Sequence, residues 1–252
     1  MIIFPSAKIN IGLQILSKRD DGFHNIYTFL YPFNELKDIL EIVKSNNKET
    51  NIHFSGNIID GVKDDNLCIK AYNLLSEIYD LPPVDIYLHK KIPVGAGLGG
   101  GSSNAAATLI LLNRMFELGI SNDELKVFAG KLGSDCAFFI DNKPAFASSR
   151  GEILEEVDFN LNNKIEVKVP NIHISTKEAY SLVKPNSNVI NLKEMIYSDI
   201  STWKDNIKND FEESIFPIHP EIKKIKDEMY ANGAVYAAMS GSGSAVYGIF
   251  DK

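Results

Sequence analysis

Apolar and polar positions alternate along several short stretches of the chain. The first runs from Ile9 to Ile15, where every second residue is apolar. A period of two is typical of a β-strand with one buried face, so we expect a strand here whose opposite, polar face carries Lys8 and Asn10. The same alternation predicts further strands at residues 84–88, 165–169, 235–239 and 245–250.

Apolar residues three or four positions apart predict helices between these strands. Such stripes run through residues 67–78, 109–116 and 125–132. Ser121 and Glu124 have the spacing of a capping box, as do Ser175 and Glu178. Pro220 is well placed to begin another helix, which Gly233 would end.

Strands and helices therefore alternate in both halves of the chain, which indicates a mixed α+β class in two lobes. The polar stretch Leu161-Asn162-Asn163 is the candidate boundary, giving domains at 1–160 and 161–252.

Residues 93–104 interrupt this pattern with a glycine-rich segment, Pro-Val-Gly-Ala-Gly-Leu-Gly-Gly-Gly-Ser-Ser-Asn, which leads into Ala105-Ala106-Ala107 and a helix. Glycine lets backbone N–H groups converge where a Cβ would block a ligand. The helix that follows adds its unpaired N–H groups and the positive end of its dipole. Such a segment suits a polyphosphate, so we expect an enzyme that uses a nucleotide.

Other glycine-rich loops fit this segment less well. A P-loop requires a lysine before Ser102 or Ser103, and none is present. Gly95, Gly97 and Gly100 match the dinucleotide fingerprint, but a second helix follows where that fold needs a strand. The sequence also lacks the HRD and DFG motifs that accompany the glycine-rich loop of a protein kinase. A flexible linker would have no reason to end in an alanine-rich helix.

Composition narrows the classes of partner. The 252 residues carry a net charge of -7, which argues against a nucleic-acid or anionic-membrane binder. Cys68 and Cys136 fit no metal or redox spacing. The apolar run at the start is broken by Pro5 and resembles no signal peptide or membrane span. These features predict a cytoplasmic protein that acts on small molecules.

Three motifs in order resemble the GHMP kinases: Lys8-Ile9-Asn10, the glycine segment at 93–104, and Ser240-Gly241-Ser242-Gly243. Within that superfamily, residues 5–13 and 18–24 are similar to the branch that phosphorylates a CDP-linked methylerythritol. Asn209-Asp210-Phe211-Glu212 also matches a stretch typical of that branch. The resemblance spans nearly the whole chain.

The resemblance implies an activity and a fold. In that branch, ATP phosphorylates the 2-hydroxyl of the methylerythritol moiety, the fourth step of the non-mevalonate isoprenoid route. The implied fold has an N-terminal lobe like ribosomal protein S5 and a C-terminal ferredoxin-like lobe, with the site between them. A kinase for another alcohol, such as homoserine or mevalonate, and a nucleotide-binding regulator without catalysis remain alternatives.

The resemblance also implies roles for individual residues. Asp135 falls on the catalytic aspartate that takes the proton of the attacking hydroxyl, and Lys8 on the catalytic lysine. Read without the family, Asp135 would be a turn residue and Lys8 a surface lysine. Magnesium would bridge the ATP phosphates, and no metal ligand can be named. The ATP segment would comprise Pro93, Val94, Gly95, Ala96, Gly97, Leu98, Gly99, Gly100, Gly101, Ser102 and Ser103.

Five residues are implied in binding the CDP-linked substrate: Asn10, Phe23, His24, Thr176 and Tyr180. Phe23 and Tyr180 would lie on opposite faces of the cytosine, and His24 would hydrogen-bond its edge. Many members of the branch have tyrosine in place of Phe23. Residues 148–152, Ser-Ser-Arg-Gly-Glu, also depart from the glycine-rich form that is common there. The sequence does not predict an oligomeric state.

Overall fold

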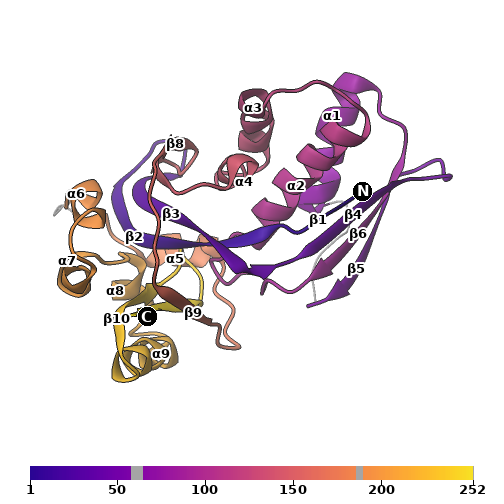
Figure 1. Cartoon of the computed structure of the whole chain (residues 1–252). Coiled ribbons are helices and arrows are strands. Elements are labelled where there is room, and N and C mark those ends of the chain that lie inside the picture. The colour runs from indigo at the N-terminus through magenta and orange to yellow at the C-terminus, as the bar shows by residue number, and fades with distance from the viewer. Residues whose placement is uncertain (58–64, 186–189, 252) are drawn as a thin grey trace. The chain divides into compact units, whose positions relative to one another are not determined.

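The computed structural model describes residues 1–57, 65–185 and 190–251 (Figure 1). The chain divides into two compact units, each assembled from several segments. The first comprises residues 1–8, 32–94 and 99–143, and the second comprises residues 9–31, 95–98 and 144–252. The glycine segment therefore contributes to both units. The boundary expected between residues 160 and 161 divides the chain into two continuous stretches, whereas each of these units combines several segments. That boundary stays a prediction.

The first unit contains a sheet in the order β1–β4–β6–β5. Its strands are β1 (Ile2–Ile3), β4 (Ile39–Lys44), β5 (Asn51–Gly56) and β6 (Val84–Lys90). β4 is antiparallel to β6, whereas β5 is parallel to it. The helices of this unit are α1 (Leu67–Tyr79), α2 (Gly100–Met115), α3 (Asn122–Leu132) and α4 (Phe138–Asp141). Helix α2 packs on β1 and β4, and α1 and α3 pack against α2.

The second unit contains most of a sheet in the order β2–β3–β7–β8 and a three-stranded sheet in the order β10–β11–β9. The first sheet consists of β2 (Ser6–Lys18), β3 (His24–Lys37), β7 (Ala145–Ser149) and β8 (Ile153–Glu156). The second consists of β9 (Lys164–Lys168), β10 (Ala234–Met239) and β11 (Val246–Phe250). Strand β11 is antiparallel to both of its neighbours.

Short helices surround these sheets in the second unit. They are α5 (Thr176–Leu182), α6 (Leu192–Ile196), the 3₁₀ helix η2 (Ile200–Thr202), α7 (Trp203–Asn206), α8 (Phe211–Ile215) and α9 (Pro220–Ala231). Helix α9 packs on β10 and β11. A core that includes Leu13, Phe211, Met229 and Val246 joins these elements.

The structure confirms the expected strands and helices, including the capping box of Ser121 and Glu124. The interpretation of β2 as a strand with one buried face is wrong. Lys8 and Asn10 are each 3% exposed, so both faces of this part of the strand are buried. The alternation in the sequence shows which positions are polar, but it does not show whether they are buried. A polar face that packs on polar partners has the same sequence pattern as a face exposed to water.

Candidate active site

The catalytic pair implied by the sequence meets in the first unit. Lys8 Nζ lies 3.4 Å from Asp135 Oδ2, with the lysine side chain 4% exposed and the aspartate side chain 35% exposed. Asp135 belongs to the turn between α3 and α4. A Cβ built on Gly99 would lie 3.1 Å from Lys8 Cε, so the lysine stem lies close against this glycine. The ion pair thus joins the early strand that carries Lys8 to the turn that carries Asp135, and the lysine stem lies beside the glycine segment.

Helix α2 begins within the glycine segment, earlier than the alanines from which we expected it. Gly99 precedes the helix in the left-handed conformation, with φ of 71°, and Gly100 is the first helical residue. Ser103 N donates to Gly99 O at 2.9 Å, the first bond of the helical ladder. Gly100, Gly101 and Ser102 therefore form the first turn, where backbone N–H groups have no helical acceptor. This turn can bind an anion.

A buried polar triad beside this turn was missed by the sequence analysis. Lys90 forms an ion pair with Asp38, and its Nζ donates to Asn104 Oδ1 at 3.0 Å. Asn104 Nδ2 donates to Asp38 Oδ2 at 2.9 Å. The other carboxylate oxygen of Asp38 accepts from the backbone N–H groups of Lys91 and Ile92, at 2.7 and 2.9 Å. The triad thus holds the chain that enters the glycine segment to the helix that leaves it.

The alternation of β6 could have revealed this lysine. Val84, Ile86 and Leu88 are buried on one face, and Lys90 continues the same period to 3% exposure. A Cβ on Gly100 would lie 3.0 Å from Lys90 Nζ, so a side chain there would crowd the triad.

In the second unit, the other part of the glycine segment packs against the connection between β10 and β11. Ser240 Oγ donates to Gly97 O at 3.0 Å, and Ala245 N donates to Ala96 O at 3.0 Å. Gly97 has φ of 81°, and a Cβ on it would lie 2.0 Å from Ser240 O. The two glycine motifs of this unit therefore fit backbone against backbone, which glycine permits.

Asn10 lies in the same unit and is held on both its side chain and its backbone. Its Nδ2 donates to Thr28 Oγ1 at 3.1 Å, and its carbonyl accepts from Tyr247 OH at 2.9 Å. Its backbone N–H donates to Ser240 Oγ at 3.3 Å. These bonds fix the residue expected to contact substrate.

His24 and Tyr180, two residues expected around the cytosine, lie together in the second unit. Their rings stack at 5.0 Å between centroids and 27° between planes. Burial, and after it the charge of Lys18, lower the pKa of His24 from its ordinary 6.5. The ring is therefore neutral near pH 7, with one nitrogen able to donate and the other to accept.

Phe23 is 51% exposed, and the Arg150 guanidinium lies over its ring, 4.9 Å from the centroid. Arg150 comes from the segment at 148–152 that departs from the usual form. The turn before Phe23 is held by Asp21, which accepts from the Phe23 N–H at 3.1 Å and pairs with Arg19 at 2.9 Å. Thr176 Oγ1 accepts from Ser242 Oγ at 3.4 Å, so α5 contacts the third motif.

Within residues 1–57, 65–185 and 190–251, no group of three or more His, Cys, Asp or Glu side chains could hold a metal ion. Across the same ranges, none of the helices has both the length and the apolar character needed to cross a membrane.

Comparison with known proteins identifies relatives over almost the full length. Residues 66–147 match the GHMP kinases N terminal domain, and residues 189–252 match the GHMP kinases C terminal domain. A 4-diphosphocytidyl-2-C-methyl-D-erythritol kinase of Bacteroides fragilis is 51% identical over 99% of this chain and 92% of its own length. One from Cytophaga hutchinsonii is 50% identical over 100% and 93%. A crystal structure of 4-(cytidine 5'-diphospho)-2C-methyl-D-erythritol kinase matches with a TM-score of 0.84 and 31% identity, over 99% and 90%.

Proposed function

Because the chain belongs to the GHMP kinases, and within them to the 4-diphosphocytidyl-2-C-methyl-D-erythritol kinases, we propose that it transfers a phosphoryl group from ATP to the 2-hydroxyl of 4-diphosphocytidyl-2-C-methyl-D-erythritol. The products are the 2-phosphate and ADP, in the non-mevalonate route to isoprenoid precursors. The observation that carries this proposal is the 51% identity to a kinase of that name along 99% of the chain.

The ion pair of Lys8 and Asp135 supplies the catalytic groups. The partly exposed Asp135 carboxylate accepts the proton of the 2-hydroxyl as its oxygen attacks the terminal phosphorus of ATP. The Lys8 ammonium orients that carboxylate and stabilises negative charge on the transferring phosphoryl group. Phosphoryl transfer needs little covalent chemistry from the protein, so positioning and charge account for most of the rate.

The glycine segment binds the ATP phosphates through the first turn of α2. Mg²⁺, when bound, neutralises phosphate charge. Magnesium commonly binds through one or two carboxylates, substrate phosphates and water. The hydroxyl of Ser102 or Ser103, at the start of α2, is the group of this segment that would face the ion.

Phe23, His24 and Tyr180 recognise the cytidine, with Asn10 and Thr176 completing the substrate contacts. An aromatic ring offers a stacking face to a base, and the neutral His24 ring can exchange hydrogen bonds with the cytosine edge. We further propose that the two partners of the enzyme are ATP and the CDP-linked alcohol, with no nucleic acid or membrane. We also propose that the enzyme acts in the cytoplasm.

Incubation of the purified protein with ATP, Mg²⁺ and the CDP-linked alcohol should yield its 2-phosphate, detected by mass spectrometry. Homoserine and mevalonate, tested in parallel, should give no phosphorylated product. Asp135→Asn keeps the shape of the side chain but removes the proton acceptor, so turnover should fall by about two to four orders of magnitude.

ADP formation that requires homoserine or mevalonate instead would assign another substrate to this chain. ATP binding without turnover of any alcohol would favour a regulator.

A further inference from the structure

The segment Asn209–Glu212 is held on strand β2 by hydrogen bonds at three points. Leu13 N donates to Lys208 O at 3.0 Å, and Asp210 N donates back to Leu13 O at 2.9 Å. Asp210 Oδ2 also accepts from Ile15 N at 2.8 Å. The backbone at residues 208–210 therefore has a defined register on a strand of the same unit.

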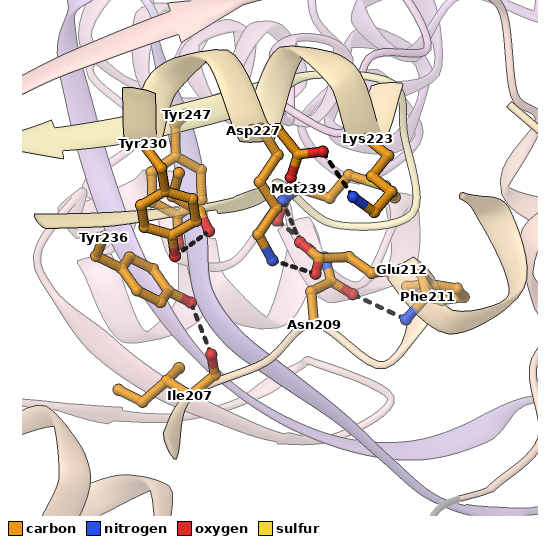
Figure 2. Close-up of polar contacts among 12 residues, drawn as sticks. Ile207, Asn209, Phe211, Glu212, Lys223, Asp227, Tyr230, Tyr236, Met239 and Tyr247 are labelled. Carbon is orange, nitrogen blue, oxygen red and sulfur yellow. Dashed lines mark hydrogen bonds and ion pairs between the residues drawn. The ribbon is translucent and has the colours of Figure 1, made fainter. Parts of the chain in front are cut away.

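From this position, two side chains hold the end of β10 (Figure 2). Asn209 is 2% exposed, and its Nδ2 donates to Met239 O at 2.9 Å. The same Nδ2 donates to Gly241 O at 2.8 Å. Glu212 Oε1 accepts from Met239 N at 2.8 Å. Both backbone polar groups of Met239 and the carbonyl of Gly241 are thus bound by this segment.

Each of the two side chains is itself fixed. Asn209 Oδ1 accepts from Phe211 N at 3.0 Å, which orients the amide group. Glu212 Oε2 accepts from Lys226 Nζ at 2.6 Å, and burial raises the pKa of this carboxyl while Lys226 opposes the change. Removing a carboxylate from water is unfavourable unless the carboxylate is paired, and the ion pair with Lys226 compensates for the burial of Glu212.

The residue between the two anchored positions reaches the glycine segment. Ser240 Oγ donates to Gly97 O and accepts from Asn10 N. A Cβ on Gly97 would lie only 2.0 Å from the carbonyl oxygen of Ser240, so the two backbones are in close contact. A shift of residues 239–241 would therefore move Ser240 relative to Gly97.

We propose that Asn209 and Glu212 are positioning residues for ATP binding: they fix the backbone of residues 239–241, and Ser240 thereby holds Gly97 in the conformation that the phosphates require. This inference rests on the proposed role of the glycine segment. It gives a function to the Asn209–Glu212 motif that is separate from contact with either substrate.

Isothermal titration calorimetry with ATP tests the proposal independently of the alcohol substrate. Asn209→Ala and Glu212→Ala should each raise the ATP dissociation constant about tenfold, the factor that corresponds to about 1.4 kcal/mol. Glu212→Gln keeps an oxygen that accepts from Met239 N but turns its NH2 group toward the Lys226 ammonium, so its dissociation constant should lie between those of the wild type and Glu212→Ala. In steady-state assays, the KM for ATP should rise while the KM for the CDP-linked alcohol stays within about twofold.

Gln14→Ala is the matched control. Gln14 is 5% exposed in the same unit, and its amide also holds a backbone, donating to Ile190 O at 3.2 Å and accepting from Ile190 N at 3.0 Å. Its loss should lower the thermal stability of the protein without changing the ATP dissociation constant. If Gln14→Ala raised the ATP dissociation constant as much as Asn209→Ala, the effect of Asn209→Ala would be explained by general destabilisation. That result would overturn the proposal.

Ser240→Ala covers the case in which Asn209→Ala does not fold, since it removes the hydroxyl that joins residues 239–241 to Gly97. Its ATP dissociation constant should rise as well. A folded Asn209→Ala or Ser240→Ala protein that binds ATP as the wild type does would refute the proposal. Absence of the 2-phosphate product from the wild-type protein would instead count against the proposed function, and the two failures are therefore distinguishable.

Discussion

Replacement of Gly97 by alanine tests the tight packing of the two glycine motifs in the second unit. Gly97 has φ of 81°, a conformation that residues with a Cβ rarely adopt. The added Cβ would lie 2.0 Å from Ser240 O and 2.9 Å from Gly243 N, both of them backbone atoms. No side-chain rotation can relieve these contacts, so the backbone itself must move.

The size of the effect follows from these distances. Ordinary van der Waals contact begins at 3.4 Å, so the two backbones must separate by about 1.4 Å. That movement would break the bond from Ser240 Oγ to Gly97 O and strain the bond from Ala245 N to Ala96 O. The left-handed conformation costs roughly 1–2 kcal/mol, and each lost hydrogen bond about 1 kcal/mol. These contributions together give an expected loss of about 2–4 kcal/mol in the free energy of unfolding.

Thermal unfolding followed by circular dichroism measures this loss. For a chain of this length, 2–4 kcal/mol corresponds to a fall in Tm of about 4 to 16 °C. Gly101→Ala is the matched control, the same chemical change four residues away. Gly101 is helical, and the nearest atom to its added Cβ is Leu67 Cδ1 at 3.8 Å. Its higher helix propensity should leave Tm unchanged or raise it by up to about 4 °C.

A Gly97→Ala protein with the Tm of the wild type would refute the reasoning, because it would show that the two backbones can separate without cost. A fall in Tm of the same size for Gly101→Ala would show that the segment tolerates no added methyl group anywhere. The close approach to Ser240 would then not be the cause.

Four further predictions concern the catalytic, substrate-binding and cysteine residues. Lys8→Met keeps the stem and removes the charge, so turnover should fall more than ATP affinity; intact turnover with lower Tm would assign the lysine a structural role. Phe23→Ala should raise the KM for the CDP-linked alcohol roughly 5- to 150-fold with the ATP KM unchanged, and Phe23→Tyr should be nearly neutral; equal damage to both constants would contradict a stacking role. Burial raises the pKa of Cys68 to about 11 and that of Cys136 to about 12, so iodoacetamide at pH 8 should label neither thiol until urea unfolds the protein, as read by mass spectrometry. Burial and the nearby Lys18 lower the pKa of His24, so folding disfavours protonation of its ring, and the stability that the neutral ring contributes is lost as pH falls from 6.5 through the lowered pKa. The Tm of His24→Gln should therefore fall less than that of the wild type over this pH range. Equal falls in Tm for the two proteins would count against this account.

The sequence by itself determined the features that depend on neighbouring residues. The apolar periods located the strand at β2 and helices α1 and α3, and the spacing of Ser121 and Glu124 marked the start of α3. A capping box forms between residues three apart, so no distant partner is needed to recognise it. The resemblance to the family implied roles for residues whose local pattern is uninformative, with Asp135 as the clearest case.

Tertiary structure decided which polar residues meet. Lys8 has the pattern of a surface lysine, yet it is buried against Asp135, which lies 127 positions away in the chain. The triad of Lys90, Asp38 and Asn104 and the hold of Asn209 on Met239 likewise join distant segments. A buried polar group needs a partner, but periodicity shows only that one is required and not where it lies. Those partners become identifiable when the sheets and helices bring their segments together.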